Sequence, residues 1–315
     1  MINKPAKATR ESFGEVLAEL GTEIESIVVF DADLSGSTKT SIFAKMFPER
    51  FFDCGIAEGN MMSIAAGAAT TGLIPVASTF AMFAAGRAFE QVRNSIGYPH
   101  LNVKICATHA GLSVGEDGAS HQCNEDIALM RVIPGMTVIC PADDIETKAA
   151  VRAAISYKGP VYLRLGRMAL PGIYDAESFK YNIGEGIEIA HGNDVTVIAT
   201  GLMVSRALDA ASILKEKGVS ARVIDIHTIK PIDRGIIKKA AMETRAIVTA
   251  EEHSIIGGLG SAVAEVIGET CPVPVIKVGV NDLFGESGPA GEILIKYGLS
   301  AESIVEAAGK AIIMK

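Results

Sequence analysis

Short apolar runs that alternate with longer amphipathic segments limit most strongly how this chain can fold. The runs span four to six residues and predict strands at 27–30, 74–78, 103–107, 137–140 and 161–165. Helical patterns lie between them, at 10–20, 60–70, 87–96, 125–131 and 144–156. Strands that are apolar along their whole length are buried on both faces, so this alternation predicts an α/β protein with a mostly parallel sheet.

The pattern lapses between residues 170 and 193 and then resumes in a second α/β unit. This unit has predicted strands at 195–200, 222–226, 246–250 and 275–278, and helices at 205–217, 233–242, 260–267 and 300–313. We therefore expect two doubly wound domains, one over residues 1–182 and one over residues 190–315.

Charge and cysteine usage exclude several classes of protein. The net charge is −8 and the basic residues form no cluster, which argues against a nucleic-acid surface. The five cysteines are widely spaced without a C-x-x-C pair, which predicts reduced thiols without a catalytic role. The first 20 residues contain no apolar segment typical of a signal peptide, so we expect a cytoplasmic protein.

A run without any charged residue extends from Met61 to Gly86, which is long enough to cross a bilayer. The run is rich in Ala, Gly, Thr and Ser, and Pro75 interrupts it. A buried helix, a turn at Gly72 and a buried strand account for this composition better than a membrane helix. We therefore expect no membrane association.

Polar side chains gather where the predicted strands of the first half end. In open α/β sheets, ligands bind beyond the carboxyl ends of the strands. The first half places there Asp31, Asp33, Ser37, Glu58, Phe80, His109, Asp117, His121 and Arg167. The second half offers fewer such groups, and we interpret its His227 and His253 as structural. The first half is therefore predicted to carry the chemistry.

Several of these loops have recognisable sequences, among them DADLSGS, CGIAEGNMMSIAAG, STFAMF, THAGLSVGEDGASHQ, LRLGR and AEEHSIIGGLGSAVAE. With them the chain resembles, nearly end to end, the C-terminal part of transketolases. The most specific piece is His109 followed by the GEDGASH loop at 115–121. The resemblance implies a pyrimidine-binding domain followed by a transketolase C-terminal domain.

The resemblance implies a site for the aminopyrimidine ring of thiamine diphosphate. It makes Glu58 the carboxyl group that contacts the ring nitrogen N1′ and shares a proton with it, so that the cofactor can generate its reactive carbon. Phe80 and Phe83 match the aromatic pocket for this ring, and Asp33 lines the same cleft. The plainer interpretations are a helix-capping Glu58 and two core phenylalanines.

The resemblance also implies a sugar site. His109, Asp117 and His121 match residues that contact the sugar, and the two histidines are the expected proton carriers beside Glu58. Arg10, Ser37 and Arg167 match positions that bind the anionic end of the substrate, although either arginine could instead be solvated. The two histidines could also bind a metal, but no third ligand with fitting spacing is evident. We predict no metal ligand in this chain.

One feature of full-length transketolases is missing from this sequence. A G-D-G motif followed by Asn, which holds the diphosphate through a metal ion, is absent; the nearest match is Glu116-Asp117-Gly118 in the substrate loop. We therefore expect a separate N-terminal transketolase-type subunit, an α2β2 assembly and a shared thiamine diphosphate. Mg²⁺ or Ca²⁺ would be held by the partner chain.

The predicted reaction transfers a two-carbon ketol unit from a ketose phosphate to an aldose. One alternative is an enzyme similar to 1-deoxyxylulose-5-phosphate synthase, a family that tends to have Asp-Arg where this chain has Thr108-His109. Others are the β subunit of a 2-oxoacid dehydrogenase and a non-catalytic regulatory partner. Many full-length transketolases have His where Gly59 stands here, which leaves the substrate open among phosphorylated, sulfonated and branched sugars.

Overall fold

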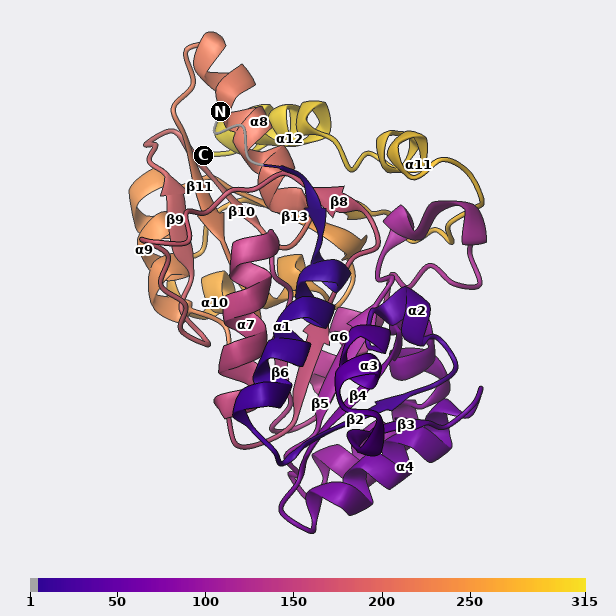
Figure 1. Cartoon of the computed structure of the whole chain (residues 1–315). Coiled ribbons are helices and arrows are strands. Elements are labelled where there is room, and N and C mark those ends of the chain that lie inside the picture. The colour runs from indigo at the N-terminus through magenta and orange to yellow at the C-terminus, as the bar shows by residue number, and fades with distance from the viewer. Residues whose placement is uncertain (1–4) are drawn as a thin grey trace.

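Two β-sheets flanked by helices make up the computed structural model, which describes residues 5–315 (Figure 1). Residues 1–4 of the first predicted domain lie outside the described part. The larger sheet has seven strands in the order β12-β6-β7-β5-β4-β2-β3. Its strands are β2 (Ile27–Asp31), β3 (Phe51–Asp53), β4 (Ile74–Phe80), β5 (Lys104–Thr108), β6 (Thr137–Ile139), β7 (Val161–Arg164) and β12 (Thr228–Lys230). The pairings from β6 to β3 are parallel, as predicted.

Helices cover both faces of this sheet. On one face, α1 (Thr9–Glu23), α3 (Ser41–Met46) and α7 (Asp144–Ser156) contribute to a core with β2, β4 and β7. On the other face, α4 (Glu58–Ala69) and α6 (Asp126–Val132) pack in a core that continues into the second half. The sheet is therefore buried on both sides, which explains its uninterrupted apolar strands.

The second sheet has five strands in the order β14-β13-β10-β11-β9, and its outer strand β9 (Ile187–Ala190) is antiparallel. The other strands are β10 (Val195–Ala199), β11 (Ala221–Asp225), β13 (Ile247–Ser254) and β14 (Val275–Val280). Its helices are α8 (Met203–Glu216), α9 (Arg234–Thr244), α10 (Leu259–Thr270), α11 (Ala290–Lys296) and α12 (Ala301–Ile313). Helices α9 and α10 share the core beneath the larger sheet, so the two halves pack as one body.

Two strand pairings connect segments that lie far apart in the sequence. Strand β12 belongs to the second half by sequence but pairs antiparallel with β6 of the first sheet. Lys230 at its end donates hydrogen bonds from Nζ to the carbonyl oxygens of Arg131 (2.7 Å) and Ile133 (2.6 Å). Strand β1 (Lys7–Ala8) pairs antiparallel with β8 (Ala169–Leu170).

The uncharged run forms α4 and β4, followed by an irregular helical segment. The single helix predicted at 87–96 is instead a π-helical turn η2 (Phe83–Arg87), a short α5 (Phe89–Gln91) and a second π-helical turn η3 (Val92–Gly97). Wide turns of this kind are frequent at functional sites, because they re-aim side chains. Within residues 5–315, no helix is both long and apolar enough to cross a membrane.

Candidate functional site

The carboxyl ends of β2, β4 and β5 bring the candidate residues together. These three strands are neighbours in the sheet order β5-β4-β2, so the loops that follow them meet at one edge. Asp33 follows β2, Phe80 ends β4 and His109 follows β5. Three residues at this edge, Asp33, Lys39 and His109, have positive φ angles of 60°, 72° and 57°. Such backbone strain in residues other than glycine is concentrated at functional sites.

Glu58 is the first residue of α4 and is only 1% exposed. Its side chain does not cap the helix. Instead, both of its carboxylate oxygens accept hydrogen bonds from Arg87 Nη1, at 3.0 Å and 2.9 Å. Arg87 lies at the end of η2, and its guanidinium also covers the ring of Phe83 at 4.5 Å from the ring centroid. The interpretation of Glu58 as a helix cap therefore does not describe this structure.

The two predicted phenylalanines form a stack with two histidines. The rings of Phe80 and Phe83 are stacked with centroids 5.7 Å apart, and Phe80 also stacks on His109 at 3.9 Å. His121 meets the ring of Phe83 edge-on at 5.4 Å. Phe83 lies on the cavity side of this stack, whereas Phe80 is buried behind it. The histidines of the β5 loop and the aromatic pocket thus form one continuous surface.

His109 is held as a neutral imidazole. Arg10 Nη1 lies 3.2 Å from His109 Nε2, and the other ring nitrogen, Nδ1, lies 2.9 Å from Thr108 Oγ1. Because a guanidinium only donates, Nε2 must accept and Nδ1 carries the proton. Burial, reinforced by the positive charges of Arg10 and Arg167, lowers the pKa of His109 to about 3. His109 therefore offers a hydrogen bond rather than a charge at neutral pH.

A rim of cations borders the histidines. Arg10 on α1 donates from Nη1 to the carbonyl oxygen of Ser37 (3.0 Å), and its Nε is buried without a hydrogen-bond partner among residues 5–315. Burial lowers the pKa of Arg10, and the charge of Arg167 acts in the same direction. Arg167 pairs with Glu116 at 2.9 Å and bonds the carbonyl oxygen of Val114. Two guanidinium groups beside a neutral histidine make this rim suitable for an anion.

The loop after β2 is fixed by a buried carboxyl group. Asp31, which ends β2, accepts hydrogen bonds from the hydroxyls of Thr38 (2.7 Å) and Thr40 (2.8 Å) and from the backbone of Leu34 (2.7 Å). Burial raises the pKa of Asp31, and these hydrogen bonds partly offset the rise. Asp33 is exposed at the cavity rim, and its N–H donates to Asp53 Oδ1 at 3.1 Å.

Two predicted residues take a less direct part, and one participant was missed. Asp117 is exposed at the end of the 3₁₀ turn η4 (Leu112–Asp117), and within residues 5–315 no hydrogen bond or ion pair joins it to the other candidates. Ser37 on α2 (Ser35–Thr38) contributes its carbonyl oxygen to Arg10. Arg87 is absent from the predicted set. The signal that could have identified Arg87 is its position as the first charged residue after the uncharged run.

The cavity suits the flat ring of a heterocyclic cofactor. It has a volume of about 350 Å³ and is lined by Ala32, Asp33, Leu34, Ile56, Glu58, Phe83, Arg87, Ser120 and His121. Arg87 places a planar cation against the face of Phe83 and in contact with both oxygens of Glu58. A protonated aminopyrimidine has a similar planar shape, charge and donor pattern, so the site fits that group. Within residues 5–315, no group of three His, Cys, Asp or Glu side chains could hold a metal ion.

Fold and site together define an α/β protein with an aromatic cavity around a buried carboxylate, beside a rim of arginines. Residues 5–172 match the pyrimidine-binding domain of transketolase, and residues 184–304 match the transketolase C-terminal domain. The chain therefore belongs to the transketolase family.

Individual relatives cover nearly the whole chain. A protein of Methanocaldococcus jannaschii is 55% identical over 302 residues, which cover 95% of both chains. That protein is named a putative transketolase C-terminal section. A 6-deoxy-6-sulfo-D-fructose transketolase subunit of a Clostridium species is 42% identical over 299 residues, covering 95% of this chain and 92% of the relative. An apulose-4-phosphate transketolase subunit of Phocaeicola vulgatus is 40% identical over 301 residues, covering 96% of both.

A solved structure agrees with these relatives. A split-gene transketolase, solved as an inactive beta4 tetramer, superimposes with a TM-score of 0.91 at 55% identity. The match covers 99% of this chain and 100% of that one. The chain thus corresponds in extent to one subunit of a split transketolase.

Proposed function

We propose that this chain is the C-terminal subunit of a two-chain transketolase, which transfers a two-carbon ketol unit from a ketose to an aldose. The observation that carries the proposal is the buried Glu58, which lines one cavity with Phe83 and has the cationic rim nearby. Thiamine diphosphate, when bound, supplies the chemistry that breaks and forms the carbon–carbon bond. The similarity to a split-gene transketolase supports a separate N-terminal subunit that completes the cofactor site.

The residues of this chain would bind, orient and exchange protons. Glu58 would hold the aminopyrimidine ring and share a proton with N1′, while Phe83, backed by Phe80, would stack on the ring. His109, as a neutral imidazole, and His121 would hydrogen-bond the sugar and move its protons. Asp117 would reach a substrate hydroxyl from the exposed side of its loop.

The cationic rim would bind the anionic end of the sugar. Arg10 has no carboxylate partner among residues 5–315 and is therefore available for a ligand. Arg167 would release Glu116 and bind the substrate in its place. Phosphate and sulfonate both suit two guanidinium groups, and one relative is named for a sulfonated ketose. We propose a phosphorylated ketose as donor, with the sulfonated sugar as the competing candidate.

The assembly and its metal belong to the same proposal. We expect an α2β2 heterotetramer in which the partner chain holds the diphosphate through Mg²⁺ or Ca²⁺. This chain would then supply the pyrimidine pocket and most of the sugar site. Thr108-His109 favours ketol transfer over the 1-deoxyxylulose-5-phosphate synthase alternative, whose members tend to have Asp-Arg at this place.

The test combines the chain with its partner. We would assay this chain alone, the N-terminal subunit alone and their mixture with thiamine diphosphate, Mg²⁺, xylulose 5-phosphate and ribose 5-phosphate, following formation of a seven-carbon sugar phosphate. Activity in the mixture alone is the expected result. Activity of this chain by itself would contradict the shared site. A mixture that binds thiamine diphosphate but converts only sulfonated or branched sugars, or 2-oxoacids, would replace the substrate proposed here.

A further inference from the structure

The sequence Glu251-Glu252-His253 lies on β13 in the second half, close to the first. Glu251 accepts hydrogen bonds from the N–H groups of Leu259 (2.6 Å) and Gly260 (2.8 Å), so it caps the start of α10. His253 Nε2 accepts a hydrogen bond from the N–H of Ala128 at 3.3 Å. Both residues therefore have structural roles, which accords with the interpretation of His253 from the sequence.

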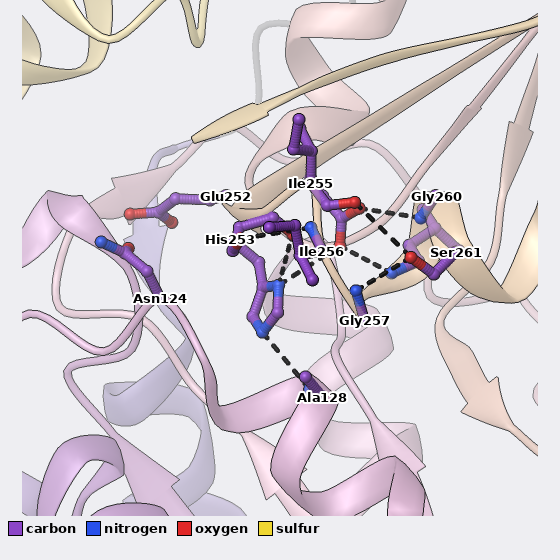
Figure 2. Close-up of polar contacts among 12 residues, drawn as sticks. Asn124, Ala128, Glu252, His253, Ile255, Ile256, Gly257, Gly260 and Ser261 are labelled. Atoms are coloured by element: carbon purple, nitrogen blue, oxygen red, sulfur yellow. Dashed lines mark hydrogen bonds and ion pairs between the residues drawn. The ribbon is translucent and has the colours of Figure 1, made fainter. Parts of the chain in front are cut away.

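Glu252 points in a different direction from these two neighbours. Figure 2 shows His253 directed at Ala128, whereas the carboxylate of Glu252 extends toward Asn124. Successive side chains of a strand alternate between its faces, which explains the divergence. Glu252 is only 4% exposed, and among the described residues no hydrogen bond joins its carboxylate to α10, which Glu251 caps. Its carboxylate is therefore directed at the first half of the chain.

The partner of this carboxylate is the loop that carries the candidate sugar-binding residues. Glu252 Oε1 accepts a hydrogen bond from the N–H of Ser113 at 2.6 Å. Gly111, with φ +77°, allows the approach, because a Cβ atom there would lie 2.4 Å from the carboxylate carbon of Glu252. A carboxylate accepting a backbone N–H in a buried place forms one of the stronger hydrogen bonds in proteins.

The loop is held by contacts from both halves of the chain. Between His109 and His121 it contains three glycines with positive φ and a kink at Gly115. Its base is closed by the hydrogen bond from Gly111 N to the carbonyl oxygen of Cys123 at 2.9 Å. Beyond that base, Arg167 of the first half bonds Val114 and Glu116. The second half adds two anchors: Glu252, and the carbonyl oxygen of Glu286, which accepts from Gln122 Nε2 at 2.9 Å.

The backbone of Glu252 is itself tied to the first half. Arg164 Nη2 donates to the carbonyl oxygen of Glu252 at 2.8 Å, and Arg164 Nε bonds Asp126 at 2.8 Å. Burial raises the pKa of Glu252, while the charge of Arg164 and the N–H of Ser113 act in the opposite direction. The carboxylate thus has a compensating cation and a fixed point of attachment.

We propose that Glu252 is a positioning residue of the second half that holds loop 111–118 in place. Asp117 within this loop and His121 shortly after it would then face the sugar. This inference rests on the proposed function for its consequence in catalysis. Through the carboxylate of Glu252, the C-terminal half would directly shape the substrate site. The holding of the loop and its effect on the sugar can be measured separately.

The first measurement is amide hydrogen exchange on the full chain, without any sugar. Glu252→Ala should speed exchange in loop 111–118 at least about tenfold, because the buried acceptor of the Ser113 N–H is lost. Glu252→Gln keeps an acceptor oxygen and should exchange nearly as slowly as the wild type. Glu265→Ala is the matched control, since it removes an ion pair with Arg131 across the same two halves without touching the loop.

The second measurement is steady-state kinetics of each variant with the N-terminal subunit. Glu252→Ala should raise KM for xylulose 5-phosphate about 10–100-fold, with an unchanged Kd for thiamine diphosphate, because a misplaced loop weakens sugar binding alone. Glu252→Gln should recover most of that loss. Should Glu252→Ala fail to fold, Glu252→Met, which keeps the bulk, takes its place in both measurements.

The outcomes separate this inference from the proposed function. Unchanged exchange in loop 111–118, or a loosened loop with a wild-type KM, overturns the positioning role. A wild-type assembly without activity toward any sugar overturns the proposed function, and the exchange data still decide whether Glu252 holds the loop.

Discussion

Arg87 Nη1 lies 2.9 Å and 3.0 Å from the two carboxylate oxygens of Glu58, so a single guanidinium nitrogen bridges both oxygens of a buried acid. The guanidinium also lies 4.5 Å from the ring centroid of Phe83. In this arrangement, a side chain of the protein takes the contacts that the proposed cofactor ring would make. If the ring binds Glu58 as proposed, it would compete with Arg87 for this carboxylate.

Removing the competing side chain should tighten cofactor binding. Arg87→Met in the two-subunit assembly is expected to lower the Kd for thiamine diphosphate about 3–10-fold. The reason is that the Arg87–Glu58 pair no longer competes with the cofactor ring for Glu58. Isothermal titration calorimetry of the assembly measures this, with Arg93→Met on the neighbouring turn as control. A weaker affinity would show that Arg87 supports the cofactor instead of competing with it.

The same ion pair predicts an asymmetric effect on stability. Arg87→Met strands a carboxylate that is 1% exposed, whereas Glu58→Gln leaves a guanidinium that is 51% exposed and open to water. We expect Arg87→Met to lower the free energy of unfolding by about 1–2 kcal/mol, after discounting for solvent screening, and Glu58→Gln to lower it less. Urea unfolding of the isolated chain gives both values. Equal losses would contradict the asymmetry.

Glu58 should be essential for turnover but not for assembly. Glu58→Gln is expected to reduce kcat about 10²–10⁴-fold, which is the range for loss of a positioned proton-transfer group. Size-exclusion chromatography with the N-terminal subunit should show an unchanged complex. Glu90→Gln, a change on the exposed side of α5, serves as control. Full activity of Glu58→Gln would support the non-catalytic alternative.

The cationic rim should select for an anionic substrate end. Arg10→Met and Arg167→Met are each expected to raise KM for xylulose 5-phosphate about 10–100-fold, because each removes a hydrogen bond to a charged group. KM for the uncharged ketose erythrulose should change less than about threefold by the same reasoning. Arg152→Met, which removes an exposed cation on α7, is the control.

Release of Arg167 predicts an effect of the opposite sign. Glu116→Gln removes the carboxylate that pairs with Arg167 at 2.9 Å, so the guanidinium is freer to bind a ligand. KM for the phosphorylated ketose should therefore fall or stay constant in this variant. An increase comparable to that of Arg167→Met would show that the ion pair holds Arg167 in its binding position.

Stability at acidic pH should depend on His227. Burial lowers the pKa of His227 to about 4, so between pH 6.5 and 4 the unfolded chain takes up a proton that the folded chain excludes. The contribution of neutral His227 to the free energy of unfolding is complete above pH 6.5 and is lost as the pH falls toward 4. The free energy of unfolding of His227→Gln should therefore rise relative to that of the wild type as the pH falls, by up to about 1.4 kcal/mol per pH unit.

The comparison between variant and wild type is needed because other buried groups act in the opposite direction. Burial raises the pKa of Asp225 and of Glu251 to about 7, so below pH 7 both carboxyl groups hold protons in the folded state that the unfolded chain takes up only near about pH 4. Denaturant unfolding of both chains at pH 7, 6 and 5 isolates the contribution of His227. A difference that stays constant with pH would contradict the prediction.

Most strands and helices could be predicted from the sequence because their signal is local. An apolar run such as 27–30 must be buried wherever it lies, and a helical pattern such as 144–156 repeats over its own length. The segment 83–97 was harder, since a π-helical turn differs from an α-helix by less than one residue per turn and has a similar apolar pattern. Strand β12 was missed because three residues carry little periodicity and its partner β6 lies about 90 residues away.

The sequence by itself determined the α/β class, the two mostly parallel sheets and the edge at which Glu58, Phe80 and His109 gather, because burial periodicity and strand ends are properties of short stretches. Only the tertiary structure decided which groups these side chains contact. The pairing of Glu58 with Arg87 depends on the wide turn at the end of η2, and the contact of Glu252 with Ser113 joins residues that are 139 positions apart. Such contacts follow from how elements pack on each other in three dimensions, which no local pattern records.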